Sequence, residues 1–295
     1  MTLAMVVRLA FILLTLSYCT LGVASASESI VKNSSMNITD MTGRSVNVPV
    51  NPNRIICLSS GTLRQICYLR QASRVVGIEE FEKSRNATRP YILANQELLS
   101  LPVIGPGGPG SINKEPDLEK VLEVMPQVIF VSYMESYRAD SLQSKLNIPV
   151  VVLTSGKFAT FDEALFDSIR LAGKVLNSED RANQVVSAVH SCIADLESRT
   201  KDIEEQDKPS VYAGAVLYKG VQGIESTDVA YAPIEWVNGR NTARNVGDSG
   251  HVFVNKETIF GWNPDIIFLD AGCIGVVERD IKAHPEFYRS LKAFI

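Results

Sequence analysis

Two stretches of the chain repeat one pattern: EKVLEVMPQVIFV at residues 119–131 and ETIFGWNPDIIFL at residues 257–269. In each, a glutamate lies seven residues before a proline, and a run of large apolar residues follows. Proline cannot continue the helical hydrogen-bond ladder, so the pattern predicts a helix, a turn and then a buried strand. Because the pattern occurs twice, it indicates two α/β halves.

The sequence around the first copy alternates in the same way. Short apolar runs typical of buried strands are RIICLSSG (54–61), RVVGI (74–78), residues 101–104, VIFV (128–131) and VVVL (150–153). Stretches with helical apolar spacing lie between them, at residues 62–69 and 118–124. Alternation of strand and helix predicts a parallel sheet covered by helices.

A helical region then separates the two halves. Residues 161–175 are amphipathic, and residues 179 to about 203 lack glycine and proline and carry one apolar stripe. A helix of that length spans about 37 Å, enough to cross between two lobes. Alternation restarts with strands at 210–217 and 265–269 and a short helix at 232–238. We expect an N-terminal lobe at 37–158, a helical connector at 159–208 and a C-terminal lobe at 209–295.

The N-terminus predicts export. Residues 1–26 combine a positive charge at Arg8, an apolar run at 9–16 and the small-residue pattern Ala24-Ser25-Ala26, which together are typical of a secretory signal peptide. Cys19 leaves attachment to a lipid open, although the bulky Tyr18 precedes it. The net charge of −4 and the absence of a basic run argue against a nucleic-acid partner. Export permits disulfides, but buried free thiols are favoured for the four cysteines of the mature chain, Cys57, Cys67, Cys192 and Cys273.

Several motifs resemble one known family. Residues 42–56, with Thr42-Gly43-Arg44 followed by Val48-Pro49 and Arg54-Ile55-Ile56, resemble its opening signature, and residues 114–131 and 253–269 resemble an element of each lobe. The family comprises periplasmic binding proteins of ABC importers for iron–siderophore complexes, haem and cobalamin. The resemblance covers about residues 37–295. It implies two Rossmann-like lobes with parallel sheets, one long connecting helix and a ligand cleft between the lobes.

The end of the chain departs from this family pattern. The family's second lobe continues past the element at 265–269 with another strand, a loop and closing helices, whereas this sequence ends at Ile295. We therefore expect an incomplete second lobe, with an unpaired strand edge or apolar surface near residues 265–269.

Candidate ligand contacts follow from the rule that ligands meet the carboxyl ends of parallel strands. Backbone N–H groups that open a helix after the first strand can hold an anion, and an arginine in its first turn can pair with one. A tyrosine can stack on a flat ligand, and a lysine favours negative charge. The predicted ligand-binding residues are Ser60, Gly61, Thr62, Arg64, Tyr133, Tyr218 and Lys219. Helix capping and solvated surface positions remain open as alternatives for these residues.

The family resemblance also implies a partner. A binding protein of this kind docks on a membrane permease with its ATPase, through one acidic residue on each lobe. These positions fall on Glu119 and Glu235. Both lie near predicted helix starts, where a carboxylate is also favoured by the helix dipole.

The predicted function is capture of an iron complex, a corrinoid or a related metal chelate outside the cytoplasm by a monomeric, non-enzymatic protein. Iron or cobalt would then belong to the ligand, because no cofactor or metal site of the protein itself is predicted. The alternatives are a metal-cofactor oxidoreductase on a two-lobed frame and an adhesion module. An enzyme requires a nucleophile–base pair or a cluster of metal ligands. The sequence has no GxSxG, HExxH or CxxC motif and only three scattered histidines.

Overall fold

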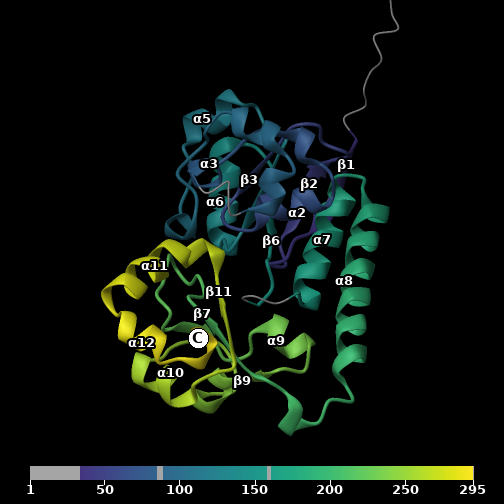
Figure 1. Ribbon diagram of the computed structural model, residues 1–295. Helices are drawn as coiled ribbons and strands as arrows, with labels where there is room; N and C mark the ends of the chain where they lie inside the picture. Colours follow the sequence, from purple (N-terminus) through teal and green to yellow (C-terminus); the bar gives the residue numbers. More distant parts are fainter. Residues whose placement is uncertain (1–33, 85–88, 158–160, 295) are drawn as a thin grey trace, which may run out of the picture. The chain divides into compact units, whose positions relative to one another are not determined.

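The computed structural model describes residues 34–84, 89–157 and 161–294. The predicted signal peptide lies outside these residues. Residues 35–295 form one compact unit (Figure 1). None of the helices within the described ranges is long and apolar enough to cross a bilayer.

The first lobe is built on a parallel sheet of four strands in the order β4-β3-β5-β6. These strands are β3 (Ile55–Leu58), β4 (Val75–Gly77), β5 (Val128–Ser132) and β6 (Val150–Leu153). Their register pairs Leu58 with Val131 and Ser132 with Leu153. Three of the four strands are buried along their whole length, as expected for a sheet with helices on both faces.

Helices cover both faces of this sheet, and the alternation of side chains along each strand divides the core in two. Ile55 and Cys57 pack with α2 (Thr62–Tyr68) and α7 (Glu163–Val175), whereas Ile56 and Leu58 pack with α5 (Leu118–Glu123) and α6 (Ser136–Leu146). Successive strand residues point to opposite faces, which explains the division. Other first-lobe elements are the hairpin β1 (Ser35–Thr39) and β2 (Ser45–Pro49), and the short helices α3 (Glu80–Ser84) and α4 (Pro90–Leu93).

The long helix expected from residue 179 is α8 (Glu179–Thr200), which has 22 residues and a length of about 33 Å. It packs along α7, where a Cβ on Gly173 would come within 2.8 Å of the Ala182 Cβ. Glycine therefore permits the close approach of the two helices. At its other end α8 approaches α9 (Ala232–Trp236) of the second lobe (Figure 1).

The second lobe contains a parallel sheet of three strands in the order β11-β7-β9. The strands are β7 (Ser210–Gly214), β9 (Arg240–Asn241) and β11 (Ile266–Leu269). The helices α10 (Lys256–Trp262), α11 (Ile274–Ala283) and α12 (Pro285–Arg289) pack with it around Tyr212, and β8 (Ser226–Asp228) pairs with β10 (His251–Phe253) in a small antiparallel ribbon. As expected, β11 is an edge strand with exposed apolar residues, since Phe268 is 58% exposed.

Two of the predicted strands were wrong in part. Residues 101–104 form no strand but a single bridge between Val103 and Ile78. Pro102 lacks an N–H group and so cannot extend the ladder. The strand expected to reach residue 217 ends at Gly214, because Ala215 adopts a left-handed conformation, with φ of 56°, that turns the chain out of the sheet.

Candidate functional site

Four loops meet at the carboxyl edge of the first sheet, because its strands are parallel. Residues 59–61 follow β3, Glu79 follows β4, Tyr133 follows β5, and residues 154–156 follow β6. Ser59 and Tyr133 have φ of 66° and 57°, in the left-handed region that non-glycine residues rarely adopt. Backbone conformations of this kind cost energy and cluster at binding sites. The carboxyl edge therefore has the local geometry of a ligand site.

Glu79 ties two of these loops together from a buried position. Its Oε1 accepts a hydrogen bond from the backbone N–H of Ser59 at 3.0 Å, and the carboxylate also accepts one from the backbone of Gly108. A Cβ on Gly107 would overlap the Glu79 side chain, so glycine is required for the loop to pack there. The pKa of Glu79 is raised to about 7, mainly by burial and also by the nearby Glu82, while the two backbone donors and Arg89 oppose the shift.

Two buried polar groups without a hydrogen-bond partner converge at the start of α2. Among the described residues, neither the Ser155 Oγ nor the Arg64 Nε has one. A Cβ on Gly61 would overlap the Ser155 Oγ and would lie 3.8 Å from an Arg64 terminal nitrogen. Unsatisfied buried groups are costly, so such a pair is a candidate donor set for an anion.

The predicted first-lobe residues divide into two kinds. Ser60, Gly61 and Arg64 are partly buried around the start of α2, and Tyr133 is 40% exposed at the end of the neighbouring strand. Thr62 differs, because its hydroxyl is buried, donates to the Leu58 carbonyl at 2.7 Å and lies 2.8 Å from the Ser132 Oγ. Its side chain therefore holds the helix to the sheet and is a poor ligand contact, contrary to the expectation from sequence.

In the second lobe an aromatic group forms at the corresponding sheet edge. The rings of Tyr218 and His251 stack with centroids 3.8 Å apart and an interplanar angle of 8°, and Phe253 meets His251 edge-on. The Lys219 Nζ lies 5.1 Å from the Tyr218 ring centroid. The His251 Nε2 is 2.7 Å from the Ser226 Oγ, and burial lowers the pKa of the imidazole. The result is a largely apolar platform beside one cation.

Sequence reasoning missed four residues of these two groups. Glu79 and Ser155 both follow first-sheet strands, so the rule that nominated Ser60 and Tyr133 could have found them. His251 and Phe253 lie on β10, a three-residue strand without a clear sequence signal. Within the described ranges, no three His, Cys, Asp or Glu side chains are grouped as a metal site. The four cysteines of the mature chain are free thiols, but only Cys57 and Cys273 are buried, and the expectation of a buried thiol was wrong for the exposed Cys192.

The two predicted docking acids are both exposed, with different surroundings. Glu119 lies in the first turn of α5, which Asp117 caps by accepting from the Lys120 N–H at 3.3 Å. Glu235 lies on α9, and both its oxygens pair with Arg244, at 3.3 Å to Nε and 2.6 Å to a terminal nitrogen. Any partner of Glu235 must therefore compete with a forked ion pair.

Two parallel α/β sheets with loops grouped at their carboxyl edges define a two-lobed receptor for small solutes. A sequence model of the periplasmic binding protein family matches residues 55–294, so the chain belongs to that family. It is a substrate-binding protein of an ABC transporter, and its relatives are binding proteins of transport rather than enzymes.

Individual relatives are distant in sequence. The chain is 22% identical to the uncharacterized ABC transporter substrate-binding lipoprotein YvrC of Bacillus subtilis over 238 residues, which are 80% of this chain and 69% of YvrC. It is 23% identical to the molybdate-binding protein MolA of Haemophilus influenzae, over 79% of this chain and 68% of MolA.

Solved structures share the fold. Molybdate-bound MolA matches with a TM-score of 0.69 and 21% identity, covering 88% of this chain and 80% of MolA. The petrobactin-binding protein YclQ of Bacillus subtilis matches with a TM-score of 0.61 and 18% identity, covering 88% of this chain and 87% of YclQ.

Proposed function

We propose that this protein captures a small anionic solute containing a metal, either a metal chelate or a metal oxyanion, outside the cytoplasm and delivers it to a membrane permease. The observation that carries the proposal is the pair of buried, unpartnered groups at the carboxyl edge of the first sheet, Arg64 Nε and Ser155 Oγ. A partly buried guanidinium without a counter-charge favours a negatively charged ligand.

The chemistry of the second lobe is compatible with the same ligand. Tyr218, His251 and Phe253 offer ring surface, and Lys219 beside them offers a positive charge. A chelate with a flat organic shell would use both features, whereas a bare oxyanion would use the charge alone. Of the relatives above, one is named for binding molybdate and another for binding petrobactin, so both ligand classes stay in the proposal.

The proposal includes the route and the partner. Residues 1–26 would direct export, and the lobes, with bounds near 37–158 and 209–295, would hold the ligand between them. Glu119 and Glu235 would then meet the permease, one from each lobe. Rim charges of this kind mainly set the association rate and the register of a complex.

Titration calorimetry with sodium molybdate and with a ferric petrobactin complex tests the ligand class. We expect one of the two to bind, and Arg64→Ala to weaken that binding by about 1.5–3 kcal/mol, or roughly 10- to 150-fold, if a charged hydrogen bond is lost. Arg289→Ala removes an arginine that is 75% exposed and serves as the matched control. Equal affinity of wild type and Arg64→Ala would remove Arg64 from the site.

A further inference from the structure

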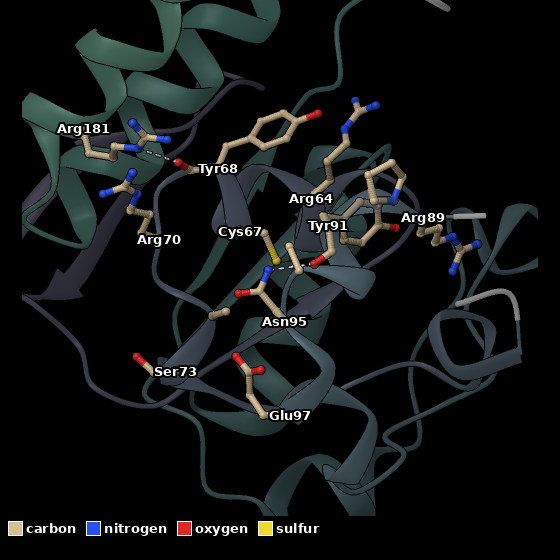
Figure 2. A pocket seen from close by; sticks show the side chains of 13 residues that line it. Arg64, Cys67, Tyr68, Arg70, Ser73, Arg89, Tyr91, Asn95, Glu97 and Arg181 are labelled. Carbon is tan, nitrogen blue, oxygen red and sulfur yellow. Dashed lines mark hydrogen bonds between the residues drawn. The ribbon is translucent and has the colours of Figure 1, made fainter. Parts of the chain in front are cut away.

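A cavity of about 770 Å³ opens on the first lobe beside α2 and α4 (Figure 2). Its lining includes four arginines, Arg64, Arg70, Arg89 and Arg181, together with the rings of Tyr68 and Tyr91. We call this cavity the arginine pocket. The proposed solute site does not account for it, because Arg64 alone belongs to both.

Three of the four arginines, Arg64, Arg70 and Arg181, form no ion pair with a carboxylate among the described residues. Within the described part of the chain, neither Arg70 nor Arg181 has a carboxylate within ion-pair distance. The Arg181 Nε donates to the Tyr68 carbonyl at 3.0 Å, which fixes that side chain at the pocket wall. Figure 2 shows the Arg70 and Arg181 side chains at the same end of the pocket, beside Tyr68. Like charges held in one wall repel each other unless an anion lies between them.

The charge of Arg89, by contrast, is neutralised within the pocket wall. Arg89 pairs with the buried Glu82 at 2.7 Å, and the Tyr91 hydroxyl donates to the same carboxylate at 2.9 Å. Glu97 is the one carboxylate among the described lining residues, and it is exposed. The uncompensated positive charge therefore lies on Arg64, Arg70 and Arg181, and the last two lie together beside Tyr68.

We propose that the arginine pocket binds a phosphate-class anion through Arg70 and Arg181. Each guanidinium presents parallel N–H donors that match two oxygens of a phosphate, and two such groups suit a multiply charged anion. Arg70 follows the C-terminal end of α2, whereas Gly61 precedes its N-terminal end, so a helix about 10 Å long separates Arg70 from the Gly61 end of the solute site. The inference therefore stands independently of the transported solute.

A phosphate-class anion has two sources, a soluble phosphate or the headgroup of an anionic phospholipid. Inorganic pyrophosphate probes the first by titration calorimetry at low salt. Vesicles of phosphatidylglycerol, compared with vesicles of phosphatidylcholine, probe the second by co-sedimentation. Specific binding in one arm identifies the source, and binding in neither arm overturns the proposal.

Charge reversal at Arg70 is the decisive variant, because the Arg70 side chain makes no hydrogen bond to another residue in the described part of the chain. We expect Arg70→Glu, and the double variant Arg70→Gln with Arg181→Gln, to weaken binding of the active probe at least about tenfold. Arg199→Gln, on the same helix as Arg181 and 72% exposed, should bind like wild type. Binding by Arg70→Glu at wild-type affinity would overturn the proposal.

A further pair of variants separates this pocket from the solute site. Ser155→Ala should leave pyrophosphate or vesicle binding unchanged, and Arg70→Glu should leave binding of molybdate or ferric petrobactin unchanged. Loss of phosphate binding in Ser155→Ala would place the anion at the sheet edge instead and contradict the assignment to the pocket. Far-ultraviolet circular dichroism of each variant shows whether it is folded.

Discussion

Glu79 accepts a hydrogen bond from the backbone N–H of Ser59, 3.0 Å away, and so joins the end of β4 to the loop that follows β3. Its carboxylate also receives the backbone N–H of Gly108, which brings in the glycine-rich loop at residues 105–110. One buried side chain thus fixes two loops of the candidate site. Ser59 itself has φ of 66°, so its left-handed conformation is maintained partly by this bond.

The raised pKa of Glu79 predicts that the stability of the protein depends on pH. Burial raises its pKa to about 7, against 4.5 for an unperturbed glutamate, so the folded chain retains a proton that the unfolded chain releases. The folded state therefore binds more protons between these values, and the free energy of unfolding should fall as pH rises from about 4.5 to 7 and level off above. The contribution is on the order of 3 kcal/mol.

Denaturant unfolding between pH 5 and pH 8 measures this contribution. Other groups titrate in the same range, so the informative quantity is the difference between wild type and Glu79→Gln, which keeps the shape of the side chain and cannot ionise. We expect the variant to show a shallower fall of stability over this window. Identical pH profiles for the two proteins would contradict the role of Glu79.

Gly61 and Gly43 form a matched pair for testing the close approach at the start of α2. Their φ values are 86° and 83°, so an alanine suffers similar backbone strain at either position, about 1 kcal/mol. A Cβ on Gly43 would meet no atom within 4 Å, whereas one on Gly61 would overlap the Ser155 Oγ. We expect Gly61→Ala to lose at least about 1 kcal/mol more than Gly43→Ala in thermal unfolding.

The same pair of variants also tests the solute site. Gly61→Ala should weaken binding of the solute, because the added methyl group displaces the Ser155 hydroxyl, and Gly43→Ala should not. Equal losses of stability in both variants, with unchanged solute binding, would show that the space beside Gly61 has no function.

Docking through the two exposed acids predicts a loss of transport without a loss of affinity. Glu119→Arg combined with Glu235→Gln should abolish uptake of the solute by cells that carry the transporter, while calorimetry of the purified variant shows wild-type affinity. Charges at the rim of an interface set the association rate and the register of the complex with the permease, so binding of the solute is not affected.

Two controls accompany this variant. Glu123→Arg reverses another exposed acid on α5 and should transport normally. Arg244→Gln frees Glu235 from its ion pair and should retain transport if Glu235 meets the permease. Normal uptake by the double variant would exclude docking through these residues.

The periodicity of the sequence predicted most of the first lobe. The runs at 128–131 and 150–153 are apolar throughout. A strand covered on both faces is a continuous apolar run, so its two ends are visible in the sequence. The continuous helix from residue 179 was equally predictable, because no glycine or proline interrupts it. The ribbon of β8 and β10 was missed because three-residue strands leave no measurable alternation.

The candidate site was less predictable, because it depends on side-chain partners. Sequence spacing placed Ser60, Gly61 and Arg64 at one strand end, but it could not reveal that the Thr62 hydroxyl bonds to Leu58 and Ser132. It also gave no sign that the Arg64 Nε has no partner among the described residues, since that depends on which atoms surround it. Local pattern identifies the edge of a sheet, and tertiary packing decides which groups remain available there.

Capture of a metal-containing anion is the central claim, and native mass spectrometry of the protein purified from its own host tests it most directly. The account predicts a single bound adduct that is released on denaturation, contains a metal by elemental analysis and is depleted in Arg64→Ala. A neutral, metal-free adduct such as a sugar or an amino acid, or a metal-containing adduct retained fully by Arg64→Ala, would contradict it.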